Sequence, residues 1–298
     1  YKKTKINFRE YFKSALKNLN TNQFADLIKG QEDLKNKSKY VERLEKAVLR
    51  AKHNIYVNKD GTIRYDASEV PITHFRPKEI KVPWKKLKEI GYDKDIYGNE
   101  LNNDDQVLEI YPQDILIPCY KDSSFEGADS ILFRTSKFID ELLVNLYGME
   151  PYYNCKTPLD LVGKHTIVLA PHVSAGILTR IIGFTETQGL FAHPYVHCAT
   201  RRDCDGDEAA FFLLMDAFLN FSKTYLPAHR GSTMDAPFVL TSILNPAEVD
   251  DMVFDMDISW NYPRELYLAG LDFKMPWDIK IETIKDHLGA EKQFEKSG

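Results

Sequence analysis

A long apolar segment between residues 209 and 225 constrains the fold of this chain more than any other feature. Its apolar side chains would lie on nearly every side of a helix: Phe211, Phe212, Leu213, Leu214, Met215, Phe218, Leu219 and Phe221. A helix of that kind is stable only inside a protein core. The sequence therefore predicts a buried helix over 209–225, and 298 residues are enough to bury a core around it.

An acidic run lies directly before this segment. Residues 201–208 read Arg-Arg-Asp-Cys-Asp-Gly-Asp-Glu, and they follow a short apolar stretch, 195–199, that we interpret as a strand. A loop held between a strand and a core helix has rigid support on both sides. The acidic run is therefore well placed to serve as a binding or catalytic site.

Three carboxylates alternate along this loop, at Asp203, Asp205 and Asp207. Residues two apart point to the same side of an extended segment, and carboxylates so close repel one another unless a cation neutralises them. Mg²⁺ takes oxygen ligands of this kind. The alternative is a solvated acidic turn in which Asp207 or Glu208 favours the dipole of the following helix.

Two known acidic motifs fit the loop less well. An EF-hand counted from Asp203 needs Gly at its sixth position and Glu at its twelfth, whereas this chain has Glu208 and Leu214 there. A haloacid-dehalogenase-type phosphatase has Asp-x-Asp directly after its strand. Here residues 200–202 intervene, which makes that interpretation weak.

Arg201 and Arg202 precede the carboxylates. Cations beside metal-binding carboxylates suit a triphosphate or a phosphodiester backbone. They could equally form salt bridges with Asp203 and Glu208, so both interpretations stay open.

The overall charge does not favour a nucleic-acid binder, because the formal net charge is −5. Basic residues are nevertheless concentrated in one stretch, 76–94. This stretch is either a solvated helix face or a phosphate-contacting surface. Its cations are Arg76, Lys78, Lys81, Lys85, Lys86, Lys88 and Lys94.

The cysteines and the hydropathy pattern bear on the compartment. No two of the four cysteines form a C-x-x-C pair, and widely spaced thiols are typical of a reducing compartment. No signal peptide and no apolar run long enough to span a bilayer is visible. We expect a soluble, cytoplasmic protein that is not associated with a membrane.

Hydrophobic periodicity predicts a mixed α/β chain in three parts. Residues 1–52 form a helical segment, 53–245 a central region of strands with inserted helices, and 246–298 a C-terminal helical and loop segment. Helices are expected at 8–16, 40–48, 82–90, 138–146 and 175–184. Strands are expected at 107–110, 114–117, 131–134 and 166–170, with a hairpin of 53–57 and 62–65 around Gly61.

Several histidines carry weaker signals. His193 and His197 next to Cys198 could suggest a metal site, but Pro194 argues for a loop and strand, so packing is the preferred interpretation. His172 and Ser174 follow the strand at 166–170, without an evident third residue for nucleophilic catalysis. Their position suits phosphate contact or structural hydrogen bonds.

Several sequence blocks resemble the large, catalytic subunit of the archaeal D-family DNA polymerases. They are collinear and cover most of 50–245, a combination far more specific than a lone Asp-Gly-Asp. They are Asp60-Gly-Thr-Ile-Arg-Tyr-Asp, Thr73-His-Phe-Arg-Pro-Lys-Glu-Ile, Phe138-Ile-Asp-Glu-Leu-Leu-Val, Leu169-Ala-Pro-His-Val-Ser-Ala-Gly-Ile-Leu, Ile181-Ile-Gly-Phe, residues 192–208, and Arg230-Gly-Ser-Thr-Met-Asp-Ala-Pro.

The resemblance implies a double-psi β-barrel core with helical appendages and DNA-directed DNA polymerase activity. It places the catalytic, metal-binding aspartates at Asp205 and Asp207, with Asp203 as a further ligand and Mg²⁺, or else Mn²⁺, as the cofactor. Arg201, Arg202, His172 and Arg230 are expected to contact phosphate. Asp203 departs from the family pattern, where Asn is expected in many relatives.

The resemblance also implies partners. These are primer–template DNA, dNTPs, a small exonuclease subunit that makes a heterodimer, and a sliding clamp bound through regions outside this chain. The family's large subunit is much longer, so we expect an internal fragment that is inactive by itself because a second barrel lies elsewhere. Two alternatives stay open: a metal-dependent phosphohydrolase, and a non-catalytic DNA-binding or assembly module.

Overall fold

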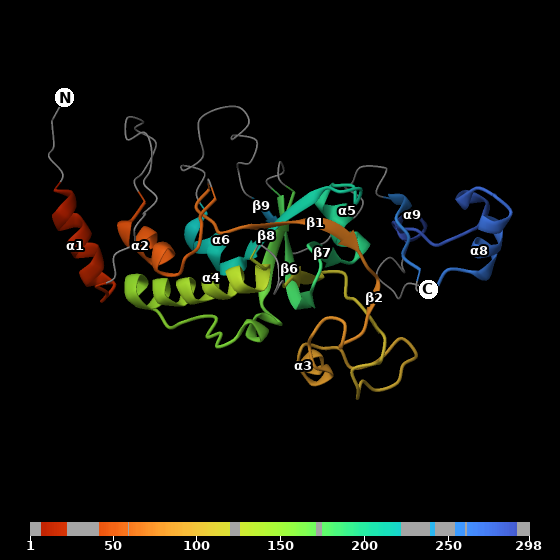
Figure 1. The fold of residues 1–298 in the computed structure, drawn as a ribbon, viewed down its shortest axis with the longest axis horizontal. Helices are drawn as coiled ribbons and strands as arrows, with labels where there is room; N and C mark the ends of the chain where they lie inside the picture. Colours follow the sequence, from red (N-terminus) through yellow and green to blue (C-terminus); the bar gives the residue numbers. More distant parts are fainter. Residues whose placement is uncertain are drawn as a thin grey trace, which may run out of the picture.

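The computed structural model has an elongated shape, with a β-barrel between two helical ends (Figure 1). Helices α1 (Phe8–Asn18) and α2 (Leu44–Lys52) lie at one end, and α8 (Arg264–Leu271) lies at the other. The structure describes residues 7–22, 42–58, 60–119, 126–170, 175–221, 239–241, 254–259 and 261–290.

The barrel is the centre of the fold. In the described part of the chain, seven strands form one sheet in the order β4-β7-β1-β8-β5-β6-β9, and a further pairing between β4 and β6 closes the first six into a ring. The strands are β1 (Tyr65–Pro71), β4 (Asp114–Pro118), β5 (His165–Leu169), β6 (Ala175–Thr185), β7 (Gly189–Ala192), β8 (Glu208–Leu213) and β9 (Val239–Thr241).

Strand directions in the barrel are mixed. β1 runs parallel to β7 and antiparallel to β8, while β4 runs parallel to β6 and antiparallel to β7. β5 is antiparallel to both of its neighbours, β6 and β8. A closed six-stranded barrel of mixed direction is consistent with the double-psi β-barrel expected from the sequence, and the mixed α/β class is confirmed.

Helices and a small sheet surround this barrel. α4 (Ala128–Leu142) runs along it and continues into a π-helical turn, Leu143–Tyr147. That turn ends at Gly148, whose φ of 64° is left-handed, as the stop signal at this glycine predicts. The remaining elements are β2 (His74–Phe75), β3 (Leu108–Glu109), α3 (Trp84–Glu89), α5 (Pro194–Thr200), α6 (Leu214–Asn220), α9 (Ile284–His287) and the 3₁₀ turns Pro158–Leu161 and Pro276–Asp278.

The apolar segment after the acidic run is not one helix, so that prediction was wrong. Residues 208–213 form β8, and the chain turns into α6 only at Leu214. Ala209 to Leu213 are all buried, because this strand belongs to the barrel and both of its faces are covered. A strand buried on both faces loses its alternating pattern and cannot be told from a buried helix by periodicity.

Three shorter predictions were wrong for local reasons. Residues 175–184 form β6 instead of a helix, since the chain returns antiparallel to β5. Residues 131–134 lie inside α4. Residues 195–199 lie in α5. His193 is the N-cap of this helix, and Pro194 occupies its first position, where proline is favoured.

The hairpin expected at 53–65 is only a turn. The amide of Asn58 donates to the carbonyl of Thr62 at 2.7 Å, and Gly61 has the positive φ, 94°, that the turn requires. The flanking segments do not pair as strands. The chain leaves α2 at Lys52, and its first strand, β1, begins only at Tyr65. The strands predicted at 114–117 and 166–170 are confirmed as β4 and β5.

One hydrophobic core joins the N-terminal helices to the barrel. Leu16 of α1, Val48 of α2, Phe138 of α4 and Phe211 of β8 are buried in a single cluster. Truncating a fully buried Phe to Ala typically costs about 3–5 kcal/mol. The N-terminal helices α1 and α2 therefore stabilise the barrel, while the boundaries at 52 and 245 stay predictions.

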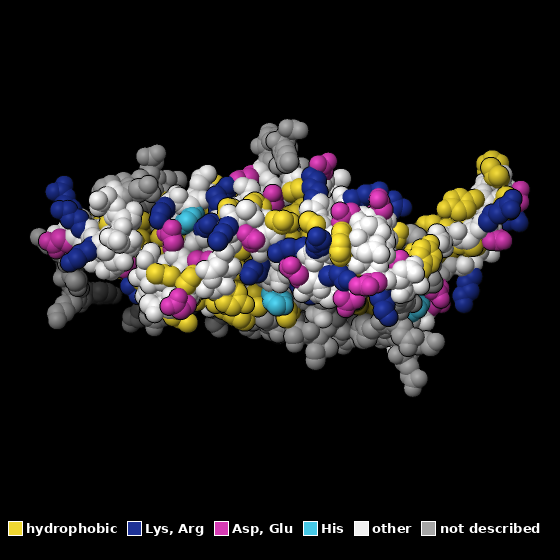
Figure 2. Space-filling view, turned by 90° about the horizontal axis from the view of Figure 1, so that it is seen from below, with side chains coloured by type: hydrophobic (Ala, Val, Ile, Leu, Met, Phe, Trp, Pro, Cys, Tyr) yellow, Lys and Arg dark blue, Asp and Glu magenta, His cyan; other side chains and the backbone are white. Residues whose placement is uncertain are grey.

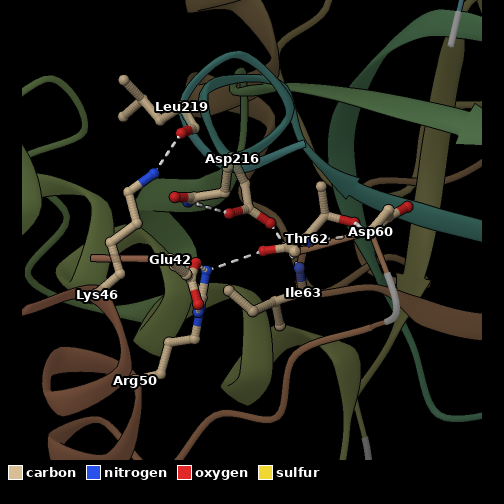
Figure 3. Close-up of polar contacts among 10 residues, drawn as sticks. Glu42, Lys46, Arg50, Asp60, Thr62, Ile63, Asp216 and Leu219 are labelled. Atoms are coloured by element: carbon tan, nitrogen blue, oxygen red, sulfur yellow. Dashed lines mark hydrogen bonds and ion pairs between the residues drawn. The ribbon is translucent and has the colours of Figure 1, made fainter. Parts of the chain in front are cut away.

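A buried polar network ties α2 and α6 to the turn before β1 (Figure 3). The Asp216 carboxylate accepts hydrogen bonds from the Ile63 amide at 2.6 Å and from the Asn220 side chain at 2.7 Å. Lys46 donates to the Leu219 carbonyl at 2.6 Å, and Arg50 donates to the Gly61 carbonyl at 3.1 Å. These bonds fix the entry into β1, the strand that lies beside the acidic loop.

The pH dependence of stability tests this network. Burial raises the pKa of Asp216 from 3.8 to about 6. The folded state favours the protonated form of Asp216. Its contribution to the unfolding free energy is therefore fully present below about pH 4 and is lost as the pH rises through about 6. Two pKa units correspond to about 3 kcal/mol.

We expect the neutral variant Asp216→Asn to lack this pH term. As the pH rises from 4 to 7, the unfolding free energy of the variant should increase relative to that of the unaltered chain. Urea denaturation at each pH measures both values. An unchanged difference between the two proteins across that range would contradict the assignment.

Candidate metal and nucleotidyl-transfer site

The acidic loop lies where the connection from β7 to β8 passes over the end of β1. β7 and β8 both pair with β1, on opposite sides of it, and residues 193–207 connect them. β7 ends opposite Pro71, and β8 begins opposite Ser68. The connection therefore spans the C-terminal half of β1, and α5 forms its first half.

Two backbone features hold the loop in place. The Glu69 amide donates to the Asp207 carbonyl at 2.9 Å, which attaches the end of the loop to β1. Arg201 ends α5 in a left-handed conformation with a φ of 61° and donates its amide to the Cys198 carbonyl at 2.9 Å. The loop is thus fixed at both of its ends.

The predicted site residues of the loop lie close together in the structure. Asp205 is exposed, and Asp203 and Asp207 are half-buried. Arg202 forms an ion pair with Asp207, with 3.0 Å between Nε and Oδ2. The sequence left open whether the arginines bind phosphate or pair with Asp203 and Glu208, and the structure pairs Arg202 with a further acid of the loop, Asp207.

His172 and Arg230 lie outside the described residues, so their expected phosphate contacts stay predictions. Ser174 also falls outside them. Arg201 is exposed at the start of the acidic loop.

The negative charge of the loop affects the pKa of the Cys204 thiol. Burial, together with the negative charges of Glu69, Asp203, Asp205 and Asp207, raises the pKa of this thiol to about 12. Four carboxylates therefore act on one point of the loop. The oxygens of Asp203, Asp205 and Asp207 do not all lie within 4.8 Å of one another, so a shared cation requires these side chains to turn toward it. Asp205 is open to solvent, and carboxylate oxygens are the ligand type that a hard divalent cation prefers.

Glu69 was not identified from the sequence. It lies on β1, with a fully buried side chain that accepts a hydrogen bond from the Thr200 hydroxyl at 2.8 Å. The signal that could have revealed it is its register. Tyr65, Ala67 and Glu69 alternate as the buried residues of β1, and a carboxylate at a buried strand position requires a partner.

The basic stretch 76–94 is largely compensated by acids. Lys78 pairs with Asp105, Lys81 with Glu186, and Lys88 with Glu100, and Arg76 pairs with Glu79 at 3.7 Å. The face seen in Figure 2 correspondingly carries blue and magenta side chains side by side. This arrangement is closer to a solvated charged surface than to a continuous phosphate-binding one.

Comparison with known proteins identifies the family. Residues 20–298 match the family described as "DNA polymerase II large subunit DP2, catalytic domain". The chain belongs to this family. The resemblance seen in the sequence blocks is therefore confirmed, and the family match extends over the acidic loop and the whole barrel.

Individual relatives agree with the family match. The chain is 49 % identical to the DNA polymerase II large subunit of Archaeoglobus fulgidus, over 99 % of this chain and 25 % of the relative. It is 49 % identical to that of Methanococcus maripaludis strain C7, over 99 % of this chain and 26 % of the relative. The corresponding values for Nanoarchaeum equitans are 47 %, 98 % and 25 %. The chain thus spans about a quarter of the length of these relatives.

One finding bears on membranes. Among the residues that the structure describes, no helix is long and apolar enough to cross a membrane.

Gly206 tests how strictly the loop is built. Its φ of 124° is a conformation that side-chain-bearing residues rarely adopt, while a Cβ added there would meet no neighbour within 4 Å. Gly206→Ala should therefore lower the unfolding free energy by about 1–3 kcal/mol through backbone strain alone.

The matched control is Gly270→Ala in α8, where a Cβ also meets nothing but the backbone is helical. That change should be neutral or stabilising by up to about 1 kcal/mol. Urea denaturation of both variants decides, and equal stability of the two would mean that the loop does not require the glycine conformation.

Proposed function

We propose that this chain carries the metal-binding aspartates of a DNA-directed DNA polymerase. The observation that supports this most is the acidic loop 203–207, attached to the end of a barrel strand in a member of the large-subunit catalytic-domain family. The reaction is template-directed nucleotidyl transfer to a primer 3′ end. The primer 3′ oxygen bonds to the α-phosphorus of a dNTP, the bond to pyrophosphate breaks, and the hydroxyl proton goes to solvent or a base.

Asp205 and Asp207 are the proposed catalytic ligands of Mg²⁺, or of Mn²⁺, and Asp203 is a third. The donor set fits, because carboxylate oxygens on a partly exposed loop suit a hard cation. When bound, the cation supplies charge neutralisation and a lower pKa for the primer hydroxyl. The protein's contribution is to position these carboxylates, since phosphoryl transfer depends on geometry and charge more than on covalent chemistry.

Arg202 holds Asp207 through their ion pair, which keeps that carboxylate in one orientation. Arg201, exposed at the start of the acidic loop, is proposed to contact phosphate. His172 and Arg230 are proposed to do the same. Guanidinium groups bind phosphate through paired hydrogen bonds, which suits both a triphosphate and a DNA backbone.

The proposed partners are those of a replicative enzyme: primer–template DNA, dNTPs, a small exonuclease subunit in a heterodimer, and a sliding clamp bound outside this chain. Because the chain spans about a quarter of its relatives, we also propose that it requires the rest of such a subunit for activity. The proposed setting is the cytoplasm, with the nucleoid.

Primer extension by the complete two-subunit enzyme tests this function. Asp205→Ala and Asp207→Ala should each reduce extension by about 100- to 1,000-fold or more, the loss expected when a group that stabilises transition-state charge is removed. DNA binding, measured by fluorescence anisotropy, should change little. The matched control is Glu208→Gln, which neutralises the next, exposed carboxylate and should keep extension near its normal rate.

Extension that persists in both aspartate variants would make the carboxylates structural and overturn the proposal. Release of phosphate from p-nitrophenyl phosphate, lost in the same variants, would instead favour the phosphohydrolase.

A further inference from the structure

Three potential metal ligands of different chemistry meet on the buried side of the acidic loop. They are Glu69 from β1, His197 from α5 and Cys204 from the loop. One ligand atom from each lies within 4.8 Å of the others. Glu69 is 3 % exposed, His197 is fully buried, and Cys204 is half-buried.

Three buried polar atoms of this cluster lack a hydrogen-bond partner among the described residues. Both ring nitrogens of His197 and Oε2 of Glu69 form no hydrogen bond with any described residue. Nδ1 of His197 lies 3.4 Å from Oε1 of Glu69, and that oxygen already accepts from Thr200. Buried polar groups are nearly always hydrogen-bonded, so three unpaired atoms in one buried cluster require an explanation.

A bound cation explains the cluster better than a water molecule does. Water would satisfy the nitrogen and the oxygen, but a thiol is a weak hydrogen-bonding group and gains little from it. A divalent ion of the zinc class accepts imidazole nitrogen, carboxylate oxygen and thiolate sulfur together. Mg²⁺ does not fit, because it prefers oxygen ligands alone.

The spacing also suits zinc. Ligand atoms about 2.0–2.3 Å from a tetrahedral ion lie about 3.3–3.8 Å from one another. Distances up to 4.8 Å before binding therefore need only small side-chain rotations to close. The charges of the Glu69 carboxylate and a Cys204 thiolate would balance those of the dication.

We propose that Glu69, His197 and Cys204 bind a zinc-class divalent ion, at a site separate from the carboxylates of Asp205 and Asp207. The ion joins three elements: β1, α5 and the middle of the acidic loop. Because Cys204 stands between Asp203 and Asp205, it holds the backbone that carries the carboxylates. The role of the ion is to position the loop, and the binding of the ion does not depend on polymerase activity.

Zinc content of the purified protein tests the site. The zinc content is measured by inductively coupled plasma mass spectrometry. Cys204→Ala and His197→Ala should each hold one equivalent less zinc per chain than the unaltered protein. The control is Cys155→Ala, which removes a buried thiol bonded to backbone carbonyls and should keep its zinc. Equal zinc in Cys204→Ala and in the unaltered protein would overturn the proposal.

A second measurement needs no ligand variant. After its zinc has been removed with a chelator, the unaltered protein should react with N-ethylmaleimide at Cys204, quantified by peptide mapping, and re-added Zn²⁺ should protect that thiol. Mg²⁺ should not protect, and Zn²⁺ should still protect in the double variant Asp205→Asn, Asp207→Asn. Alkylation of Cys204 at the same rate with and without Zn²⁺, or protection lost in the double variant, would refute the site.

Discussion

The parallel pairing of β4 with β6 is the constraint on which the rest of the structure depends. It joins the two ends of a six-strand run into a ring, so each of these strands has a neighbour on both sides. A closed barrel leaves no strand edge exposed and fixes the tilt and register of its members. β1 is therefore held between β7 and β8, and the connection between those two strands must cross it. The acidic loop owes its position to that crossing.

The fold was predictable where the information is local. The strands at 114–118 and 165–169, the helix stop at Gly148 and the turn at Gly61 each follow from a few neighbouring residues. Prediction failed at β6 and β8, where a helix was expected. Both strands are buried by the barrel on one side and by helices on the other, which removes the alternation that marks a strand. Ring closure itself depends on pairings between distant segments that no local pattern contains.

The candidate site divides in the same way. The carboxylates at 203, 205 and 207 and the arginines beside them are contiguous, so the sequence alone identified them as candidates. The ion pairing expected for the arginines was with Asp203 and Glu208, whereas Arg202 pairs with Asp207. Glu69 could not be associated with them, because its proximity arises from the register of β1 with β8, in which Ser68 lies opposite Glu208. The helix formed by 194–200, which turns His197 inward, was also hidden by interpreting Pro194 as a breaker instead of a helix start.

The place of β8 in the ring has a consequence for synthesis. β8 pairs with β1, made early, and with β5, and it is the last of the six ring strands in chain order. A nascent chain that has not yet released Leu213 from the ribosome cannot complete the ring, and β1 must wait beside β7 with one edge unpaired. Long-range closure of this kind is slow and leaves strand edges open to association with other chains. The carboxylate loop is attached to β1 when β8 pairs with it, so a nascent chain that ends before β8 cannot hold this loop in its final form.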